Sequence, residues 1–263
     1  MGFVKVNDLN LHYKIRGSGP RLLFIHGIGA DLRHPISIFN TAVPEHFTVL
    51  AFDPRGLGES DVPNGPYTMA DMADDAVGLA AALGWSRYHV LGASMGGMVA
   101  QEVALRHPEV VEKLVLAVTN AGRGNGAPVV IDRTWNMSTL EQLRTSDIRQ
   151  DEAWVAANPE AVRQMEQGFQ AAKAALQADP KAWEGWQRQV QAVLEHDAFD
   201  RLHQIQAETL VFNGRFDGSQ PPEVPRAMAA RLPHARFELV EHGHGSWYFD
   251  PSVWDMVIEF LND

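Results

Sequence analysis

The pentapeptide Gly92-Ala93-Ser94-Met95-Gly96 follows a short apolar run at residues 88–91 and opens a segment with helical spacing of apolar residues. A G-x-S-x-G sequence between a strand and a helix is typical of a nucleophile elbow. The sharp turn holds the nucleophile in a strained backbone conformation, so the residues beside it must be small. The helix that follows presents free backbone N–H groups to a developing oxyanion. The motif therefore predicts that Ser94 is a nucleophile; the alternative is a tight turn with an exposed serine.

The rest of the chain alternates between short apolar runs and helical patterns. An apolar run without polar interruptions is typical of a strand that is buried on both faces of a sheet. Thr68 and Asp71 form a capping-box pattern before one of the helical segments. This alternation predicts an α/β protein with a mostly parallel sheet. The expected strands are residues 3–6, 11–16, 21–26, 48–52, 88–91, 113–118, 209–212 and 236–240, and the expected helices are residues 69–83, 94–107, 222–232 and 251–261.

Residues 120–206 interrupt this alternation, because no convincing strand is found there. After a glycine-rich loop the composition turns to alanine, glutamine, tryptophan and charged residues, and Trp183 and Trp186 share a helical face with Val190. We therefore expect a helical insertion at residues 120–206. It would separate two parts of one α/β core, residues 1–119 and 207–263.

Two histidines and one aspartate occupy positions from which they could act with Ser94. His242 and His244 lie between the last expected strand and the last expected helix, and Asp217 follows the strand at residues 209–212. The carboxyl ends of parallel strands share one edge of the sheet, where ligands bind in open α/β folds. His244, which two glycines flank, is preferred to His242 as the general base. A zinc site formed by the two histidines is disfavoured, because no third ligand has a suitable spacing.

Two backbone N–H groups are expected to hold an oxyanion beside the nucleophile. Met95, directly after Ser94, supplies one of them. Ile28, in the loop after the strand at residues 21–26, is the candidate for the second. Both expectations follow from the nucleophile-elbow motif, in which the residue after the nucleophile and the loop after the third strand supply the donors.

Other charged groups near this edge are expected to have structural roles. For Asp53 and Arg55, which follow the strand at residues 48–52, fastening of loops is favoured over a charged substrate clamp. Asp250 stands directly before Pro251 and is typical of a helix N-cap.

The composition excludes several classes of function. The 263 residues carry 22 Lys and Arg against 33 Asp and Glu, and the formal net charge of −11 disfavours binding to nucleic acid. The chain has no cysteine, which excludes disulfides, thiolate metal sites and a cysteine nucleophile. No apolar run approaches the ~20 residues of a membrane span, and no signal-peptide pattern opens the chain. We expect a cytoplasmic protein that acts on a small molecule, needs no metal or cofactor and does not bind a membrane. The formation of a homo-oligomer is left open.

These motifs resemble those of the α/β-hydrolase superfamily over nearly the whole chain. The matching segments are His-Gly-Ile-Gly at 26–29, Asp-Pro-Arg-Gly-Leu-Gly-Glu-Ser at 53–60, Gly-Ala-Ser-Met-Gly-Gly at 92–97, Gly-Arg-Phe-Asp at 214–217 and Gly-His at 243–244. The resemblance implies an α/β-hydrolase fold with an eight-stranded, mostly parallel sheet and a helical cap at residues 120–206. Within the superfamily, the chain is similar to the single-cap branch of enol-lactonases, small carboxylesterases, carbon–carbon bond hydrolases and cofactor-free perhydrolases.

The resemblance also assigns roles to residues. It implies a nucleophile at Ser94, an acid at Asp217, a base at His244 and oxyanion donors at Ile28 and Met95. The chain order of serine, acid and base is that of the superfamily. A haloalkane dehalogenase would need aspartate at position 94, so the serine found there argues against that activity.

The predicted activity is a serine hydrolase that cleaves a small, largely apolar carboxylic ester or lactone through an acyl-enzyme. A carbon–carbon bond hydrolase or a perhydrolase with the same triad is the alternative, and a non-catalytic ligand receptor is a third hypothesis. Packing between helices is the competing explanation for each residue expected in the substrate pocket. The residues expected to line an apolar pocket are Met98, Trp135, Trp154, Trp186 and Trp247, and the candidates for a carboxylate clamp are Arg123, Arg133 and Arg144.

Overall fold

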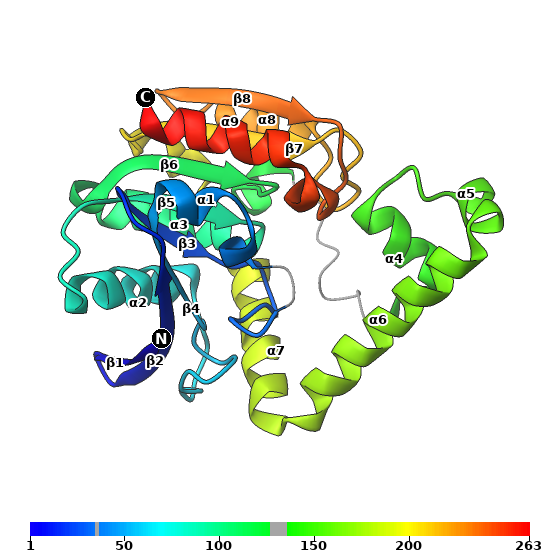
Figure 1. Ribbon diagram of the computed structural model, residues 1–263, viewed down its shortest axis with the longest axis horizontal. Coiled ribbons are helices and arrows are strands. Elements are labelled where there is room, and N and C mark those ends of the chain that lie inside the picture. The colour runs from blue at the N-terminus through cyan, green and yellow to red at the C-terminus, as the bar shows by residue number, and fades with distance from the viewer. Residues whose placement is uncertain (35–36, 127–135) are drawn as a thin grey trace.

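The computed structural model describes residues 1–34, 37–126 and 136–263, and its eight strands form one sheet (Figure 1). The strand order is β1-β2-β4-β3-β5-β6-β7-β8. β2 pairs antiparallel with β1 and β4, and the other neighbours are parallel. The predicted eight-stranded, mostly parallel sheet is therefore confirmed. The strands are β1 (Gly2–Val6), β2 (Leu9–Arg16), β3 (Arg21–Ile25), β4 (Thr48–Phe52), β5 (Tyr88–Ala93), β6 (Val111–Ala117), β7 (Glu208–Gly214) and β8 (Ala235–Val240).

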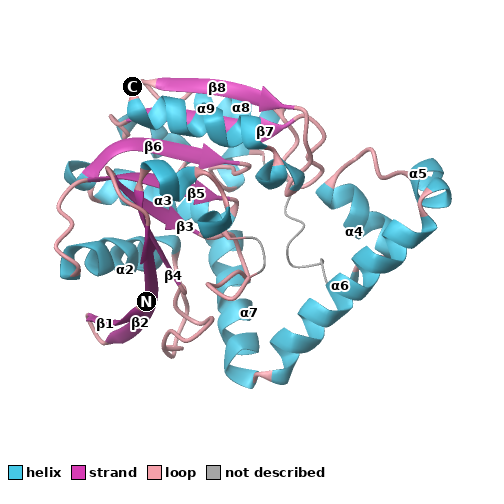
Figure 2. Cartoon of the chain, viewed as in Figure 1, coloured by secondary structure: helices cyan, strands magenta, loops and turns pink. Residues whose placement is uncertain are grey.

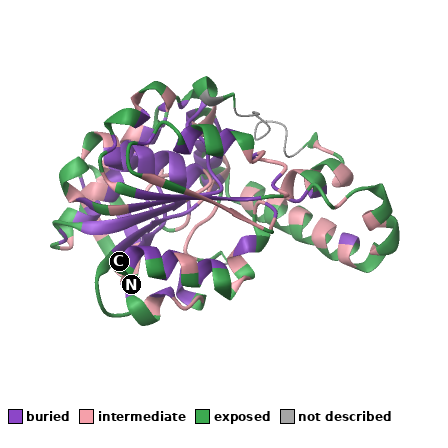
Figure 3. Ribbon diagram, turned by 90° about the horizontal axis from the view of Figure 1, so that it is seen from above, coloured by how far each residue is buried: buried purple, intermediate pink, exposed green. Residues whose placement is uncertain are grey.

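The central strands send alternate side chains into two apolar cores, one on each face of the sheet. In β3, Leu23 and Ile25 belong to one core, and Leu22 and Phe24 belong to the other. All four side chains are buried. Figure 3 shows the buried strands between layers of helices. Because both faces are covered, a central strand carries apolar residues at consecutive positions, which explains the uninterrupted runs in the sequence.

Helices cover both faces of the sheet. Thr68 accepts a hydrogen bond from the N–H of Asp71, whose side chain accepts in return from the N–H of Thr68, so the predicted capping box is present. Within residues 1–34, 37–126 and 136–263, no helix has both the length and the apolar character to cross a bilayer. One face is covered by α2 (Met69–Ala82), α3 (Met95–Arg106) and α8 (Glu223–Ala229), and the other by α1 (Val43–His46) and α9 (Pro251–Asn262).

Four helices between β6 and β7 lie beyond the carboxyl ends of the parallel strands (Figure 2). α7 packs on the core in a small buried cluster that includes Trp186 and Leu57. α6 extends away from the sheet, and Val162 is its one buried residue. The helices are α4 (Thr139–Ser146), α5 (Glu152–Ala157), α6 (Pro159–Ala178) and α7 (Pro180–Glu195). These helices fall within the predicted insertion at 120–206, whose separation from the core as a cap domain stays a prediction.

Buried charged groups hold the loop that follows β4. Asp53 has no exposed surface, and its carboxylate accepts hydrogen bonds from the N–H groups of Leu32 at 2.7 Å and Glu59 at 2.9 Å. Arg55 donates to the two carboxylate oxygens of Asp75 at 2.6 and 2.8 Å. The structural roles predicted for Asp53 and Arg55 are therefore confirmed.

Asp75→Ala is expected to destabilise the fold by about 3–5 kcal/mol, because it leaves the largely buried guanidinium of Arg55 without its bidentate partner. Asp74→Ala, on the same helix, is the matched control. Asp74 pairs with Arg106 and His107 at the surface, and exposed pairs typically contribute about 0–1 kcal/mol each. Chemical denaturation measures the free energy of unfolding of each variant. Equal losses of stability in the two variants would contradict the larger contribution expected of the buried Arg55–Asp75 pair.

Candidate active site

Ser94 occupies the turn between β5 and α3 with backbone angles of φ 54° and ψ −120°. This conformation is strained for a residue with a side chain, so the surrounding structure must hold it. The N–H of Ser94 donates to the carbonyl oxygen of Ala117 at 2.9 Å, and the hydroxyl of Thr119 donates to the carbonyl oxygen of Ser94 at 2.7 Å. A Cβ at Gly92 would lie 2.1 Å from the carbonyl oxygen of Gly96. The small residues of the motif thus leave room for a turn that packs backbone against backbone.

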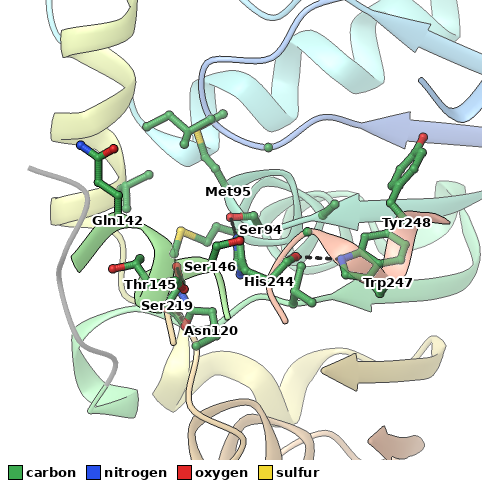
Figure 4. A pocket seen from close by; sticks show the side chains of 18 of the residues that line it. Ser94, Met95, Asn120, Gln142, Thr145, Ser146, Ser219, His244, Trp247 and Tyr248 are labelled. Atoms are coloured by element: carbon green, nitrogen blue, oxygen red, sulfur yellow. Dashed lines mark hydrogen bonds between the residues drawn. The ribbon is translucent and has the colours of Figure 1, made fainter. Parts of the chain in front are cut away.

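The structure brings Ser94, Asp217 and His244 together at the carboxyl edge of the sheet. Nε2 of His244 lies 3.2 Å from Oγ of Ser94 (Figure 4). Nδ1 of the same ring lies 2.8 Å from Oδ2 of Asp217. Asp217 is buried, and its Oδ1 accepts hydrogen bonds from the N–H groups of Ser219 and Gln220, both at 2.8 Å. The carboxylate is therefore fixed in place while its other oxygen faces the imidazole.

Asp217 also raises the pKa of His244. Burial lowers the pKa of His244, but the charge of the Asp217 carboxylate and its hydrogen bond more than offset this effect. As a result, the pKa of His244 lies above its ordinary value of 6.5.

This shift predicts the pH dependence of the reaction if His244 is the base. A neutral imidazole is needed to accept the proton of Ser94, so kcat/KM should fall as the pH drops through the pKa of His244. We expect the acid limb to have an apparent pKa above 6.5. A pH profile of kcat/KM with an uncharged ester measures it, and an acid limb below that value would contradict the prediction.

His242, the alternative base, is engaged elsewhere. Its Nε2 lies 2.7 Å from Oδ2 of Asp250, and Asp250 caps α9 by accepting from the N–H of Ser252, as predicted. The hydrogen bonds from His242 and Ser252 lower the pKa of Asp250 to about 2. In the described part of the chain, no cluster of three His, Cys, Asp or Glu side chains is arranged to hold a metal ion.

Ile28 and Met95 lie where donors to an oxyanion are expected, since both line the cavity that contains Ser94. Met95 is the first residue of α3, and an N–H group in the first turn has no partner inside its helix. The loop of Ile28 is also held by the insertion, because the N–H of Gly29 donates to Oε1 of Gln189 on α7 at 3.3 Å. The first turn of α3 therefore holds Met95, and a contact with α7 helps to hold the loop of Ile28.

A cavity of about 440 Å³ adjoins Ser94 and is lined by residues from the core and from the insertion. Small-molecule sites typically have volumes of about 300–1,000 Å³. Among the described residues of its wall, Arg123 carries the one permanent charge and no carboxylate is present. The apolar part includes Ile28, Ala93, Met95, Met98, Val118, Met137, Phe169, Val193, Trp247 and Tyr248, and the polar part beside Ser94 and His244 includes His34, Asn120, Gln142, Thr145, Ser146, Ser219 and Gln220.

The five residues predicted to line an apolar pocket have different locations. Met98 and Trp247 line the cavity, whereas Trp154 and Trp186 do not. Trp186 is buried in the packing of α7, and its ring stacks on Trp183 with the centroids 5.1 Å apart. Trp154 lies half-buried on α5, away from the cavity wall.

The remaining predictions concern one tryptophan and three arginines. Trp135 and Arg133 lie outside the described residues. Of the other two candidates for a carboxylate clamp, Arg123 lines the cavity and Arg144 does not.

Sequence analysis did not single out several polar residues of the wall. Asn120 follows β6, is buried, and donates from Nδ2 to Oε1 of Gln220 at 2.9 Å. Ser146 ends α4 and lies beside His244 (Figure 4). Asn120 could have been found from its position at the carboxyl end of a predicted strand. Nothing in the sequence distinguishes Ser146 from the other residues of the helical insertion.

Comparison with known proteins identifies the family. A family model described as the alpha/beta hydrolase fold matches residues 20–251. A poly(3-hydroxyalkanoate) depolymerase of Ectopseudomonas oleovorans is 29% identical over 252 residues, which cover 92% of this chain and 84% of that protein.

Solved structures agree with this assignment. A thermophilic esterase from Thermogutta terrifontis superposes with a TM-score of 0.77 at 27% identity, covering 100% of this chain and 98% of that one. The enol-lactonase from Burkholderia xenovorans LB400 has the same fold, with a TM-score of 0.78, 24% identity and 100% coverage of both chains. The chain is therefore a member of the α/β-hydrolase superfamily and is a hydrolase of that fold.

Proposed function

We propose that the protein is a serine hydrolase that cleaves a small, largely apolar carboxylic ester or lactone through an acyl-enzyme on Ser94. The observation that carries the proposal is the continuous hydrogen-bonded series from Ser94 through His244 to Asp217. It opens on a cavity of suitable size. A serine hydroxyl with a base within hydrogen-bond reach, and a third group that orients the base, is the arrangement of an activated nucleophile.

The first half of the reaction forms the acyl-enzyme. His244 accepts the proton of Ser94 as its Oγ attacks the substrate carbonyl, and the negative charge develops on the carbonyl oxygen. His244 then gives the proton to the leaving oxygen as the ester bond breaks. Asp217 holds the imidazole in the tautomer with Nε2 unprotonated and stabilises the cation that forms.

The second half removes the acyl group. His244 accepts a proton from a water molecule, whose oxygen attacks the acyl carbon, and returns the proton to Oγ of Ser94 as the acid leaves. In both halves the N–H groups of Ile28 and Met95 donate to the oxyanion. One such donor typically contributes about 3 kcal/mol to the stability of the transition state.

The cavity wall supports an apolar substrate of modest size. Side chains such as Met98, Phe169 and Trp247 give it apolar surface, and no described residue of the wall carries a negative charge. The relatives include a depolymerase, an esterase and an enol-lactonase, and these activities are compatible with attack on an ester carbonyl. We further propose that residues 120–206 act as a cap that helps to select the substrate.

A fluorophosphonate probe and a p-nitrophenyl ester series test the proposal. We expect stoichiometric labelling of Ser94, hydrolysis of short acyl esters, and a pre-steady-state burst from the acyl-enzyme. The same protein is assayed with a vinylogous diketone, and with a carboxylic acid and peroxide. Faster turnover of either than of every ester and lactone would favour carbon–carbon cleavage or perhydrolysis, and absence of labelling and of turnover would favour a ligand receptor.

A further inference from the structure

The end of α4 lies against the loop that carries His244. The carbonyl oxygen of Ser146 accepts a hydrogen bond from the N–H of His244 itself, at 2.6 Å. On the other side, the carbonyl oxygen of His244 accepts from Nε1 of Trp247 at 2.9 Å (Figure 4). The backbone of His244 is therefore held between the helical insertion and the core.

The same segment also holds the loop of Asp217, on both sides of the carboxylate. The N–H of Ile148 donates to the carbonyl oxygen of Phe216 at 2.9 Å. The hydroxyl of Ser219 donates to the carbonyl oxygen of Thr145 at 3.1 Å. We call residues 144–148 the α4 clamp, because this short segment contacts both loops that form the bond between His244 and Asp217.

Two glycines allow the α4 clamp to approach so closely. A Cβ at Gly243 would lie 2.4 Å from the carbonyl oxygen of Ser146, and one at Gly218 would lie 2.0 Å from that of Arg144. Neither glycine has a φ in the left-handed region, so an alanine could adopt the backbone conformation of either. Glycine is therefore needed at these positions for space and not for conformation.

We propose that the α4 clamp positions His244 against Asp217, so that the helical insertion completes the geometry of the triad as well as contributing to the cavity wall. Gly218 and Gly243 are positioning residues in this arrangement, since they admit the clamp and neither lines the cavity. The inference rests on the proposed function, in which His244 is the base. A displacement of about 1 Å in a catalytic group can lower a rate by about 10²-fold.

Gly243→Ala is the first test, because the added methyl group must move the clamp or the His244 loop. We expect kcat to fall by about 10²-fold with a smaller change in KM. We also expect the low-field proton resonance of the His244–Asp217 hydrogen bond to shift or disappear. Gly168→Ala is the matched control: it makes the same change inside α6, where a Cβ would meet nothing within 4 Å. It should keep the kcat and the resonance of the wild type.

Ser219→Ala provides a second test that does not depend on the folding of a crowded variant. It removes the hydroxyl that donates to Thr145, while the backbone N–H of residue 219 can still donate to Asp217. The loss of one such hydrogen bond should lower kcat by about threefold to tenfold. Folded Gly243→Ala with the kcat and resonance of the wild type would overturn the proposal. If Gly243→Ala does not fold, Ser219→Ala with unchanged kcat and resonance would overturn it.

The two readouts separate this inference from the proposed function. The proton resonance reports the His244–Asp217 bond whether or not an ester is a substrate. If the wild type cleaves no ester or lactone but the resonance moves in Gly243→Ala and not in Gly168→Ala, the clamp stands and the proposed function fails. If the wild type is an active esterase and both clamp variants behave like it, the clamp fails and the function stands.

Discussion

Ser94→Ala is expected to lower the turnover of an ester by about 10⁵-fold or more, because the members of a triad act as a unit and no other group can form the acyl bond. The substitution removes one oxygen atom and keeps Cβ, so the elbow should retain its conformation. Fluorophosphonate labelling should disappear together with turnover. Circular dichroism and thermal unfolding should match the wild type.

A serine outside the site is the control for this substitution. Ser86 lies in the exposed turn before β5, and Ser86→Ala should keep the activity of the wild type. Residual turnover of Ser94→Ala within tenfold of the wild type, with a purified and folded protein, would refute the nucleophile. A loss of folding in Ser94→Ala would instead show that the hydroxyl has a structural role.

Asp217→Asn is expected to lower kcat by about 10⁴-fold. The amide N–H₂ of asparagine donates to Nδ1 of His244 where the carboxylate accepted from it, so the proton moves to Nε2 and the imidazole cannot accept the proton of Ser94. Loss of the negative charge also removes the interaction that raises the pKa of His244. Steady-state kinetics on a reactive ester measure the effect.

Asp250→Asn is the matched control for this change. Asp250 also pairs with a histidine, His242, at 2.7 Å, but it caps α9 and lies outside the triad. We expect the activity of Asp250→Asn to be close to that of the wild type, with at most a small loss of stability. A large loss of activity in Asp250→Asn and a small one in Asp217→Asn would indicate that His242 and Asp250, and not His244 and Asp217, act with Ser94.

The core of the fold could be predicted from the sequence because its signals are local. The apolar run at 21–26 and the pentapeptide at 92–96 each define a strand or a turn without reference to distant residues. The relation of Ser94, Asp217 and His244 was also accessible, since the carboxyl ends of parallel strands meet at one edge. Topology therefore predicts that these segments meet once the strands are assigned, whereas the preference for His244 over His242 comes from its flanking glycines.

The cavity wall could not be predicted to the same degree. The spacing of Trp183, Trp186 and Val190 identifies a helical face, but the sequence does not say whether that face meets the core or the substrate. In the structure it meets the core, through Leu57. The wall depends on how the insertion is placed on the sheet, and this placement uses contacts between residues far apart in the chain.

The α4 clamp illustrates a second reason why contacts of the insertion could not be predicted from the sequence. Its hydrogen bonds join backbone groups, such as the carbonyl oxygen of Ser146 and the N–H of His244, so side-chain identity carries little information about them. Gly218 and Gly243 are the sequence feature that these close backbone contacts require. Glycine is common in loops for several reasons, so this feature is not specific.

The unusual backbone of Ser94 has a consequence for protein engineering. A side chain held at such angles typically costs about 1–3 kcal/mol, and glycine would avoid this cost while losing roughly 0.5–1 kcal/mol through its greater freedom when unfolded. The free energy of unfolding of Ser94→Gly should consequently exceed that of the wild type by about 1 kcal/mol. A screen for thermal tolerance alone would then reward the loss of the reactive hydroxyl, so any directed-evolution campaign on this scaffold needs to select for turnover at every round.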